Sequence, residues 1–125
     1  MASPPPLSDR EWKIMSRLWD QSPQSAYDLI ETFSRSERWH PNTVRTMLAR
    51  LVAKGALDTE RYKNLFLYHP KVDREACVRA ESDSFLRKVF GGALKPLLVH
   101  FASREPLTDA EARELRRLLS PRRRK

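Results

Sequence analysis

The chain has 125 residues, of which 40% are hydrophobic and 32% are charged, and its net charge is +8. This length fits one domain, or one compact domain with an arm. No apolar run approaches the roughly 18–20 residues that a bilayer crossing needs, so we expect a cytoplasmic protein without membrane insertion. The single cysteine, Cys77, excludes an internal disulfide and a thiolate metal cluster.

The positive charge is spread unevenly along the chain. Residues 1–34 carry three Lys/Arg against five Asp/Glu, whereas residues 35–70 carry seven against three. Residues 71–125 carry fourteen against eight, and much of that excess is the run Arg122, Arg123, Arg124 and Lys125. A basic middle segment indicates a polyanionic partner. We interpret residues 121–125 as a plain basic tail.

The first predicted helix begins after a proline-rich segment, residues 1–6, for which we expect disorder. Ser8 and Glu11 have the spacing of a capping box, and Leu7 and Trp12 that of a hydrophobic staple. We expect the helix to end near Asp20. Its buried face should comprise Trp12, Met15, Leu18 and Trp19, with Ile14 at the edge.

A second, short helix is predicted to begin at Ser25, which can cap together with Asp28, and to end near Arg35. Its apolar residues fall on one side: Ala26, Leu29, Ile30 and Phe33. A short polar connection leads to a third helix. This spacing is typical of a helix-turn-helix.

The third helix, within HPNTVRTMLARLVAKG at residues 40–55, has two different faces. Pro41 suits its first turn and Gly55 its C-terminal end. One face is an apolar stripe of Val44, Met47, Leu48, Leu51 and Val52. The other face carries no carboxylate and offers side chains that read base edges or contact phosphates, together with one small residue, Ala49, that allows close approach: Asn42, Thr43, Arg45, Thr46, Ala49 and Arg50. On this helix alone, an ordinary solvated surface explains the pattern equally well.

After Gly55 the apolar period changes from 3.6 toward 2, which predicts a hairpin with strands at 56–61 and 65–69. Lys63 and Asn64 suit its tip, and we expect Asn64 to tolerate a positive φ there. Arg61 and Lys63 would bring basic groups to backbone phosphates. Three helices and a hairpin predict a winged-helix DNA-binding domain over residues 7–72.

Residues 73–120 are predicted to form a separate helical arm. A helix capped by Asp73 should run to about Phe90 and break at Gly91 and Gly92, followed by helices over 93–103 and after Thr108. These helices cannot bury their apolar stripes alone, so we expect a homodimer. The expected interface comprises Phe85, Val89, Leu94, Leu97, Leu98, Phe101, Leu115, Leu118 and Leu119. The alternative is an arm folded back on the winged helix.

The fold class is therefore mainly α with a small β-hairpin, and its segments match a known family in order and spacing: LSDREWKIMSRLW at 7–19, HPNTVRTMLARLVAKGAL at 40–57, LFLYHP at 65–70, SFL at 84–86 and LLVHF at 97–101. The chain resembles the penicillinase and methicillin-resistance repressors. This resemblance implies a winged-helix dimer that binds a pseudo-palindromic operator and represses resistance genes. It also implies a sensor metalloprotease system and a cut in the arm, at the bond between His100 and Phe101. Asn42, Arg45 and His100 stand where the family has Lys, Gln and Asn.

Two other function classes compete with a DNA-binding repressor. The chain lacks the residues that an enzyme would need, because its three His are far apart in sequence and it has no HExxH, CxxC or GxGxxG motif. We therefore expect no catalytic residues, no cofactor and no metal. A winged helix that contacts only proteins should expose apolar anchors, whereas the third helix exposes Asn, Thr and Arg. Release of a repressor by a ligand, not by cleavage, also stays open. The predicted DNA-binding residues are Asn42, Thr43, Arg45, Thr46, Arg50, Arg61 and Lys63.

Overall fold

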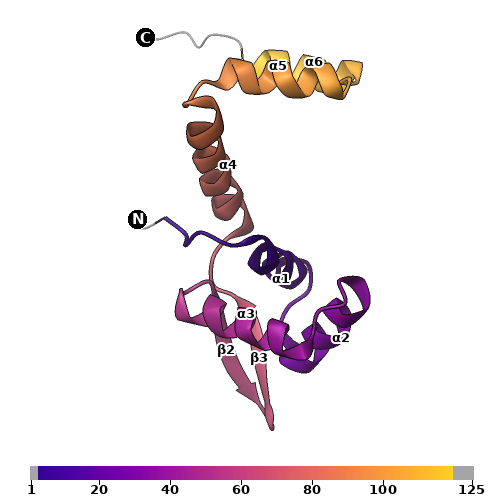
Figure 1. Cartoon of the computed structure of the whole chain (residues 1–125), viewed down its shortest axis with the longest axis vertical. Helices are drawn as coiled ribbons and strands as arrows, with labels where there is room; N and C mark the ends of the chain where they lie inside the picture. The colour runs from indigo at the N-terminus through magenta and orange to yellow at the C-terminus, as the bar shows by residue number, and fades with distance from the viewer. Residues whose placement is uncertain (1–2, 120–125) are drawn as a thin grey trace. The chain divides into compact units, whose positions relative to one another are not determined.

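The computed structural model describes residues 3–119, which form six helices and three strands (Figure 1). In chain order these are α1 (Asp9–Asp20), β1 (Gln24–Ser25), α2 (Ala26–Ser36), α3 (Pro41–Ala53), β2 (Leu57–Tyr62), β3 (Leu65–Pro70), α4 (Arg74–Phe90), α5 (Leu94–Arg104) and α6 (Asp109–Leu119). The chain divides into two compact units between Ser82 and Asp83, within α4. The predicted class, mainly α with a small β-hairpin, is confirmed. In the part of the chain that is described, no helix is long and apolar enough to cross a membrane.

Three capping boxes form where the sequence predicts helix starts: Ser8 with Glu11, Ser25 with Asp28, and Thr108 with Glu111. In each box the hydroxyl accepts a backbone N–H from the third helical residue, and the carboxylate accepts the N–H of the cap. Each box therefore pairs two backbone donors that the helix itself leaves open. Local side-chain chemistry thus fixes the starts of α1, α2 and α6.

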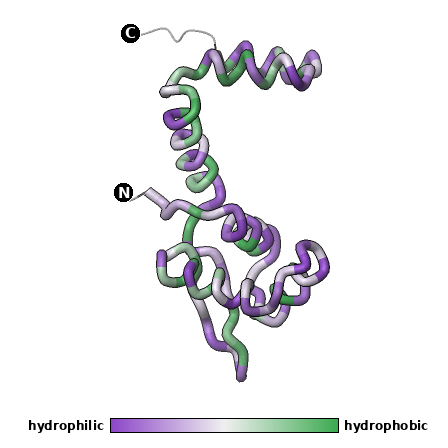
Figure 2. The backbone as a smooth tube through the Cα atoms, viewed as in Figure 1, coloured by the Kyte–Doolittle hydropathy of each residue, from purple (hydrophilic) through white to green (hydrophobic). Residues whose placement is uncertain are grey.

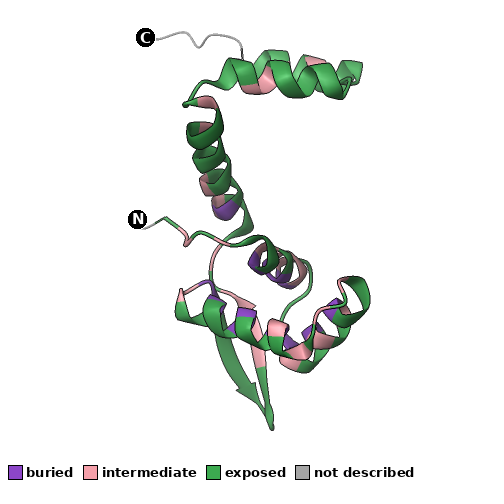
Figure 3. Ribbon diagram, in the orientation of Figure 1, coloured by how far each residue is buried: buried purple, intermediate pink, exposed green. Residues whose placement is uncertain are grey.

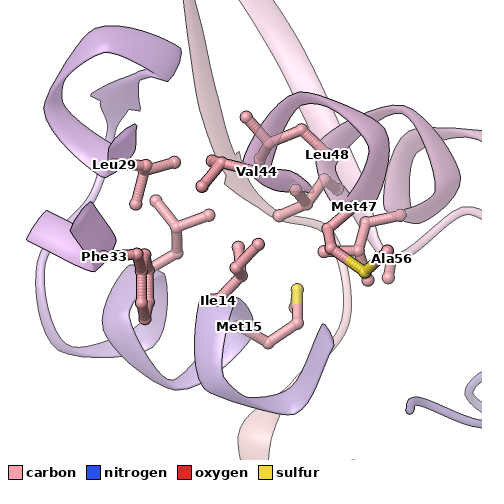
Figure 4. Close-up of a cluster of buried hydrophobic side chains, with 11 residues drawn as sticks. Ile14, Met15, Leu29, Phe33, Val44, Met47, Leu48 and Ala56 are labelled. Carbon is pink, nitrogen blue, oxygen red and sulfur yellow. The ribbon is translucent and has the colours of Figure 1, made fainter. Parts of the chain in front are cut away.

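The core of the first unit lies where α1, α2 and α3 meet (Figure 4). Fully buried side chains come from all three helices and from β2: Ile14, Met15, Leu18, Leu29, Val44, Leu48, Leu51 and Leu57. The prediction that Ile14 lies only at the edge of the buried face of α1 is wrong, since Ile14 is 0% exposed. Trp12 and Trp19 are half-buried, with edge-to-face rings 5.7 Å apart. Trp19 lies at the border because its Nε1–H donates to the carbonyl of Val72 over 3.0 Å.

The sheet has the order β1-β3-β2, and both pairings are antiparallel. The hairpin of β2 and β3 has the register Leu57 opposite Pro70 and Tyr62 opposite Leu65. The two-residue strand β1 is too short to show a period and was not predicted. At the tip, Lys63 and not Asn64 has the positive φ, of 57°. A two-residue hairpin loop demands positive φ at its first central residue, and that demand outweighs the preference of Asn.

The first turns of α4 belong to the first unit and are fixed there. Arg74 donates to Asp20 Oδ1 over 2.8 Å and to the carbonyl of Ser16 over 3.1 Å. The predicted cap forms, because Asp73 accepts the N–H of Ala76. Cys77 is 3% exposed, and burial, followed by the charge of Asp73, raises the pKa of its thiol. The thiol therefore stays protonated, as in a packed helix residue.

In the second unit the helices pack few side chains. Figure 2 shows hydrophobic and hydrophilic residues alternating along α5 and α6. Figure 3 shows most of these helices as exposed, and none of the side chains described between residues 83 and 118 is buried. Gly91 and Gly92 break the helix as predicted, with φ of 63° and 88°. The basic tail, residues 121–125, and the stop at Pro121 lie outside the described residues.

Candidate nucleic-acid interface

The helix α3 is fixed at its first turn and along one face. Its N-cap is His40, whose Nδ1 accepts the backbone N–H of Asn42 over 3.0 Å, and Pro41 takes the first helical position as predicted. Val44, Leu48 and Leu51 are at most 1% exposed. Because this face is locked in the core, the orientation of the opposite face is determined too.

The outer face of α3 comprises Asn42, Thr43, Arg45, Thr46, Ala49 and Arg50. All are exposed except Thr43, which is half-buried. The first turn carries no acidic residue. Within residues 3–119, none of these side chains forms an ion pair or a side-chain hydrogen bond. The outer face therefore presents amide, hydroxyl and guanidinium groups whose hydrogen-bonding capacity is open to a partner.

The connection from α2 to α3 is held by aromatic stacking. The rings of Phe33 and Trp39 lie 4.9 Å apart with an interplanar angle of 14°. The backbone N–H of Trp39 donates to the carbonyl of Phe33 over 3.2 Å. Between them Arg38 has a φ of 59°, a conformation that costs energy in a residue other than glycine. Arg38 is exposed beside the start of α3 and is absent from the predicted set, since sequence alone gives no signal for its backbone conformation.

The hairpin carries both predicted basic residues, and each lies over an aromatic ring of the hairpin itself. The Arg61 guanidinium is 5.3 Å from the ring centre of Phe66, and the Lys63 Nζ is 5.4 Å from that of Tyr62. Tyr62 and Phe66 are 56% and 55% exposed. Exposed contacts of this kind contribute about 0.5–1 kcal/mol. They restrain the two cations and leave their charge at the surface.

A hollow of about 530 Å³ lies between α3 and the hairpin. It is lined by Ala26, Arg45, Leu48, Ala49, Val52, Ala53, Thr59, Phe66 and Tyr68. Val52 is 38% exposed, so its predicted place in the buried stripe of α3 is wrong. In the last turn of α3, Leu51 is fully buried in the core, whereas its neighbour Val52 lines the hollow and is covered only in part. The hollow depends on the distance between two elements, which no local pattern specifies.

The residues of the predicted arm interface lie in α4, α5 and α6. Phe85, Val89, Leu94, Phe101 and Leu118 are between 42% and 60% exposed, whereas Leu97, Leu98 and Leu115 are half-buried. The side chain of Leu119 lies outside the described residues. The interface stays a prediction, because a single copy of the chain carries no partner surface.

The bond between His100 and Phe101 lies inside α5. Both residues are exposed, and their rings meet edge to face 4.9 Å apart. The His100 carbonyl also accepts the hydroxyl of Ser103 over 2.9 Å. This helix must unfold locally before a protease can cleave the bond. Among the residues described, no three His, Cys, Asp or Glu lie together as a metal site would require.

Comparisons with known proteins bear on both units. The model of the penicillinase repressor family matches residues 7–121. The chain is 32% identical to the penicillinase repressor of Bacillus licheniformis over 115 residues, which cover 92% of this chain and 90% of the relative. It is also 32% identical to the methicillin resistance regulatory protein MecI of Staphylococcus aureus (strain N315), over 91% of this chain and 93% of that protein.

Two solved structures are similar to part of this chain. One is the DNA-binding domain of the repressor BlaI, with 34% identity and a TM-score of 0.55. The other is the monomeric form of Bacillus licheniformis BlaI in complex with the blaP half-operator, with 34% identity and a TM-score of 0.54. Each match covers 61% of this chain and 93% of the other.

Proposed function

Because the chain belongs to the penicillinase repressor family, we propose that it is a sequence-specific DNA-binding repressor of transcription. The observation that carries the proposal is the outer face of α3, which is basic, free of carboxylates and without partners inside the described chain. A relative of the same fold is solved on a half-operator, which supports double-stranded DNA as the partner. The role is non-enzymatic, and the protein acts in the cytoplasm, where operator DNA is found.

Base reading falls to Asn42 and Arg45 on this proposal. Arg pairs naturally with O6 and N7 of guanine, and Asn with N6 and N7 of adenine. Both side chains are exposed on the first two turns of α3. Thr43 and Thr46 flank them and can donate to or accept from base edges or phosphates. The first turns of α3 therefore carry the sequence preference.

Phosphate binding falls to Arg50, Arg61 and Lys63. Arg50 lies near the end of α3, and the other two lie at the end of the hairpin. Their charges strengthen binding to any duplex, because cations that neutralise phosphates release counterions. They position the protein without reading sequence.

The active form on this proposal is a homodimer joined through the arm. Supporting it, large apolar side chains stay exposed along α4–α6 while no described side chain between residues 83 and 118 is buried. A two-fold dimer presents two α3 helices to two inverted half-sites. We assign residues 7–72 to DNA binding and residues 73–120 to dimerisation.

Release of the operator is proposed to follow cleavage between His100 and Phe101 by a sensor metalloprotease system. The cut removes α6 and the last four residues of α5 from the DNA-binding unit. The second candidate is release by a small molecule, and the hollow beside Arg45 favours it.

Selection from a random DNA library with the full-length chain tests the proposal. We expect enrichment of a sequence with two inverted half-sites, about one helical turn apart or slightly more. If no sequence is enriched over the starting library at physiological salt, the proposal is wrong. The protein-contact alternative is then favoured.

A further inference from the structure

We propose that the hollow between α3 and the hairpin binds a flat apolar molecule with one carboxylate, and that this ligand competes with operator DNA for Arg45. The binding site follows from the hollow alone. The competition rests on the proposed function, because it requires that Arg45 contact DNA.

The size and lining of the hollow suit a small organic molecule. Its volume of about 530 Å³ lies within the roughly 300–1,000 Å³ typical of ligand pockets. Five of its nine lining residues are aliphatic residues from two helices: Ala26, Leu48, Ala49, Val52 and Ala53. Phe66 and Tyr68 supply aromatic rings from β3 on the opposite side. A flat molecule can therefore insert between a helix face and two rings.

The apolar surface here exceeds what the core requires. Val52 is 38% exposed and Phe66 is 55% exposed, while the core of α1–α3 closes without them. Contiguous exposed apolar surface is characteristic of binding sites. The DNA backbone is a charged and strongly hydrated chain, and gains little from aliphatic walls. The lining thus favours a small apolar ligand as the occupant.

The charge of the lining indicates which polar group the ligand should carry. Arg45 is the one charged residue in the lining, and no carboxylate lines the hollow. Within residues 3–119 the Arg45 guanidinium has no ion-pair partner. Thr59 and Tyr68, directly opposite each other on β2 and β3, add hydroxyl-bearing side chains to the same face. A guanidinium prefers a carboxylate, which it can bind through two parallel hydrogen bonds.

Competition follows because one side chain serves both ligands. A guanidinium held by a carboxylate in the hollow cannot also bind a base edge. Such coupling is reciprocal, so bound DNA must lower the affinity of the protein for the ligand by the same factor as bound ligand lowers its affinity for DNA. With complete exclusion and ligand at ten times its Kd, the apparent Kd for DNA rises about elevenfold.

Binding is tested with 2-naphthoate as the probe and the neutral 2-naphthamide as its matched control, by NMR titration of the full-length chain. We expect 2-naphthoate to shift the backbone amide signals of Ala49, Ala53 and Thr59, and we expect 2-naphthamide to bind at least tenfold more weakly. Shifts elsewhere only, or equal affinity for both probes, overturn the site.

Two pairs of variants locate the contact. Arg45→Gln should weaken the binding of 2-naphthoate at least tenfold. Arg50→Gln is the same change on the same helix but outside the lining, and its affinity for 2-naphthoate should stay within about twofold of wild type. Ala53→Leu should fill the hollow and Phe66→Ala should remove one wall, and each should weaken the probe. Because Ala53 and Phe66 lie on different elements, the test still holds if one of the two variants fails to fold. Equal loss in Arg50→Gln overturns the assignment of Arg45.

The competition is measured with the duplex obtained by selection. We expect the elevenfold rise in wild type and no rise in Ala53→Leu at the same probe concentration. Probe bound in the hollow with unchanged DNA affinity overturns the competition. If the protein binds the probe but no DNA, the proposed function is wrong and the proposed ligand site is retained. If it binds DNA but not the probe, the ligand site is wrong and the proposed function is retained.

Discussion

Lys54 Nζ lies 2.8 Å from Glu11 Oε1, which joins the C-terminal end of α3 to the first turn of α1. The same ammonium donates to the carbonyl of Pro6 over 2.9 Å. Glu11 is 3% exposed and also caps α1 through Ser8. A buried carboxylate is tolerated only when it is paired and hydrogen-bonded. One side chain therefore fixes α1 and the far end of the proposed DNA-reading helix together.

Glu11→Gln should lower the free energy of unfolding by about 1–3 kcal/mol at pH 7, because it leaves the Lys54 ammonium, whose side chain is 30% exposed, without its counter-charge. Burial alone raises the pKa of Glu11, but the hydrogen bond from Lys54, the bond from Ser8 N–H and the charge of Lys54 together hold it below its ordinary value of 4.5. Since the folded pKa is the lower one, this stabilisation is present above the unfolded pKa and is lost as pH falls through the folded pKa. The gap between wild type and variant should therefore narrow below about pH 4.5.

Urea unfolding from pH 7 to pH 3 measures that gap. Glu31→Gln is the matched control, because Glu31 pairs with Arg35 at the surface, where the two side chains are 69% and 80% exposed. Such pairs contribute about 0–1 kcal/mol, so the control should stay close to wild type. A gap for Glu11→Gln that is constant or widens toward acid contradicts the assigned role of the carboxylate.

The sequence was sufficient for features set by neighbouring residues and insufficient for those set by packing between elements. The capping boxes and the break at Gly91 depend on residues a few positions apart, and they form as predicted. The burial of Ile14 and the exposure of Val52 depend on how the helices and the hairpin meet in space. For the same reason the basic face of α3 could be anticipated, whereas the hollow beside Arg45 could not.

Alanine at Asn42 or Arg45 should relax the sequence preference. Each base contact contributes about 1–3 kcal/mol of discrimination, which is lost with the side chain. Selection from random DNA should then return a degenerate position in each half-site for each variant. Thr32→Ala on α2, outside the proposed interface, should keep the wild-type preference. Unchanged preference in both α3 variants means that other residues read the bases.

Replacing Arg50, Arg61 or Lys63 by Gln should weaken binding to all duplexes alike. The loss of one phosphate contact lowers the slope of log Kd against log salt concentration by about one unit. Titrations between 50 and 200 mM salt, with specific and random duplexes, measure both effects. Lys88→Gln on α4 removes the same charge outside the proposed interface, and its slope should match wild type. A variant that weakens only the specific duplex is a base-reading residue.

The proposed dimer predicts a sedimenting mass of roughly twice the 14.6 kDa of one chain at micromolar concentration. Val89→Glu places a charge in the proposed interface and should shift the equilibrium strongly toward monomer, because a buried unpaired carboxylate is costly. Val99→Glu is the matched control, since Val99 is 59% exposed on α5 and lies outside the proposed interface. A monomeric wild type contradicts the dimer, and equal effects of both variants contradict the assigned face.

A chain that ends at His100 reproduces the product of the proposed cleavage. It retains α1–α4, the first seven residues of α5 and the outer face of α3, but loses α6 and the last four residues of α5, with the apolar residues Phe101, Leu115 and Leu118. Linkage of two binding modules raises affinity by about 10²–10⁴ over one module without any new contact. We therefore expect affinity for an inverted two-site duplex to fall by that factor.

Affinity for a single half-site should stay within about twofold of the full-length chain, because every proposed base and phosphate contact lies before residue 64. Fluorescence anisotropy with one-site and two-site duplexes of equal length separates the two quantities. Equal losses on both duplexes indicate that the DNA-binding unit itself is damaged and not merely unlinked. If the truncated chain binds the two-site duplex as tightly as the full chain, cleavage at this bond does not release the operator. Occupation of the hollow beside Arg45 then becomes the favoured route of release.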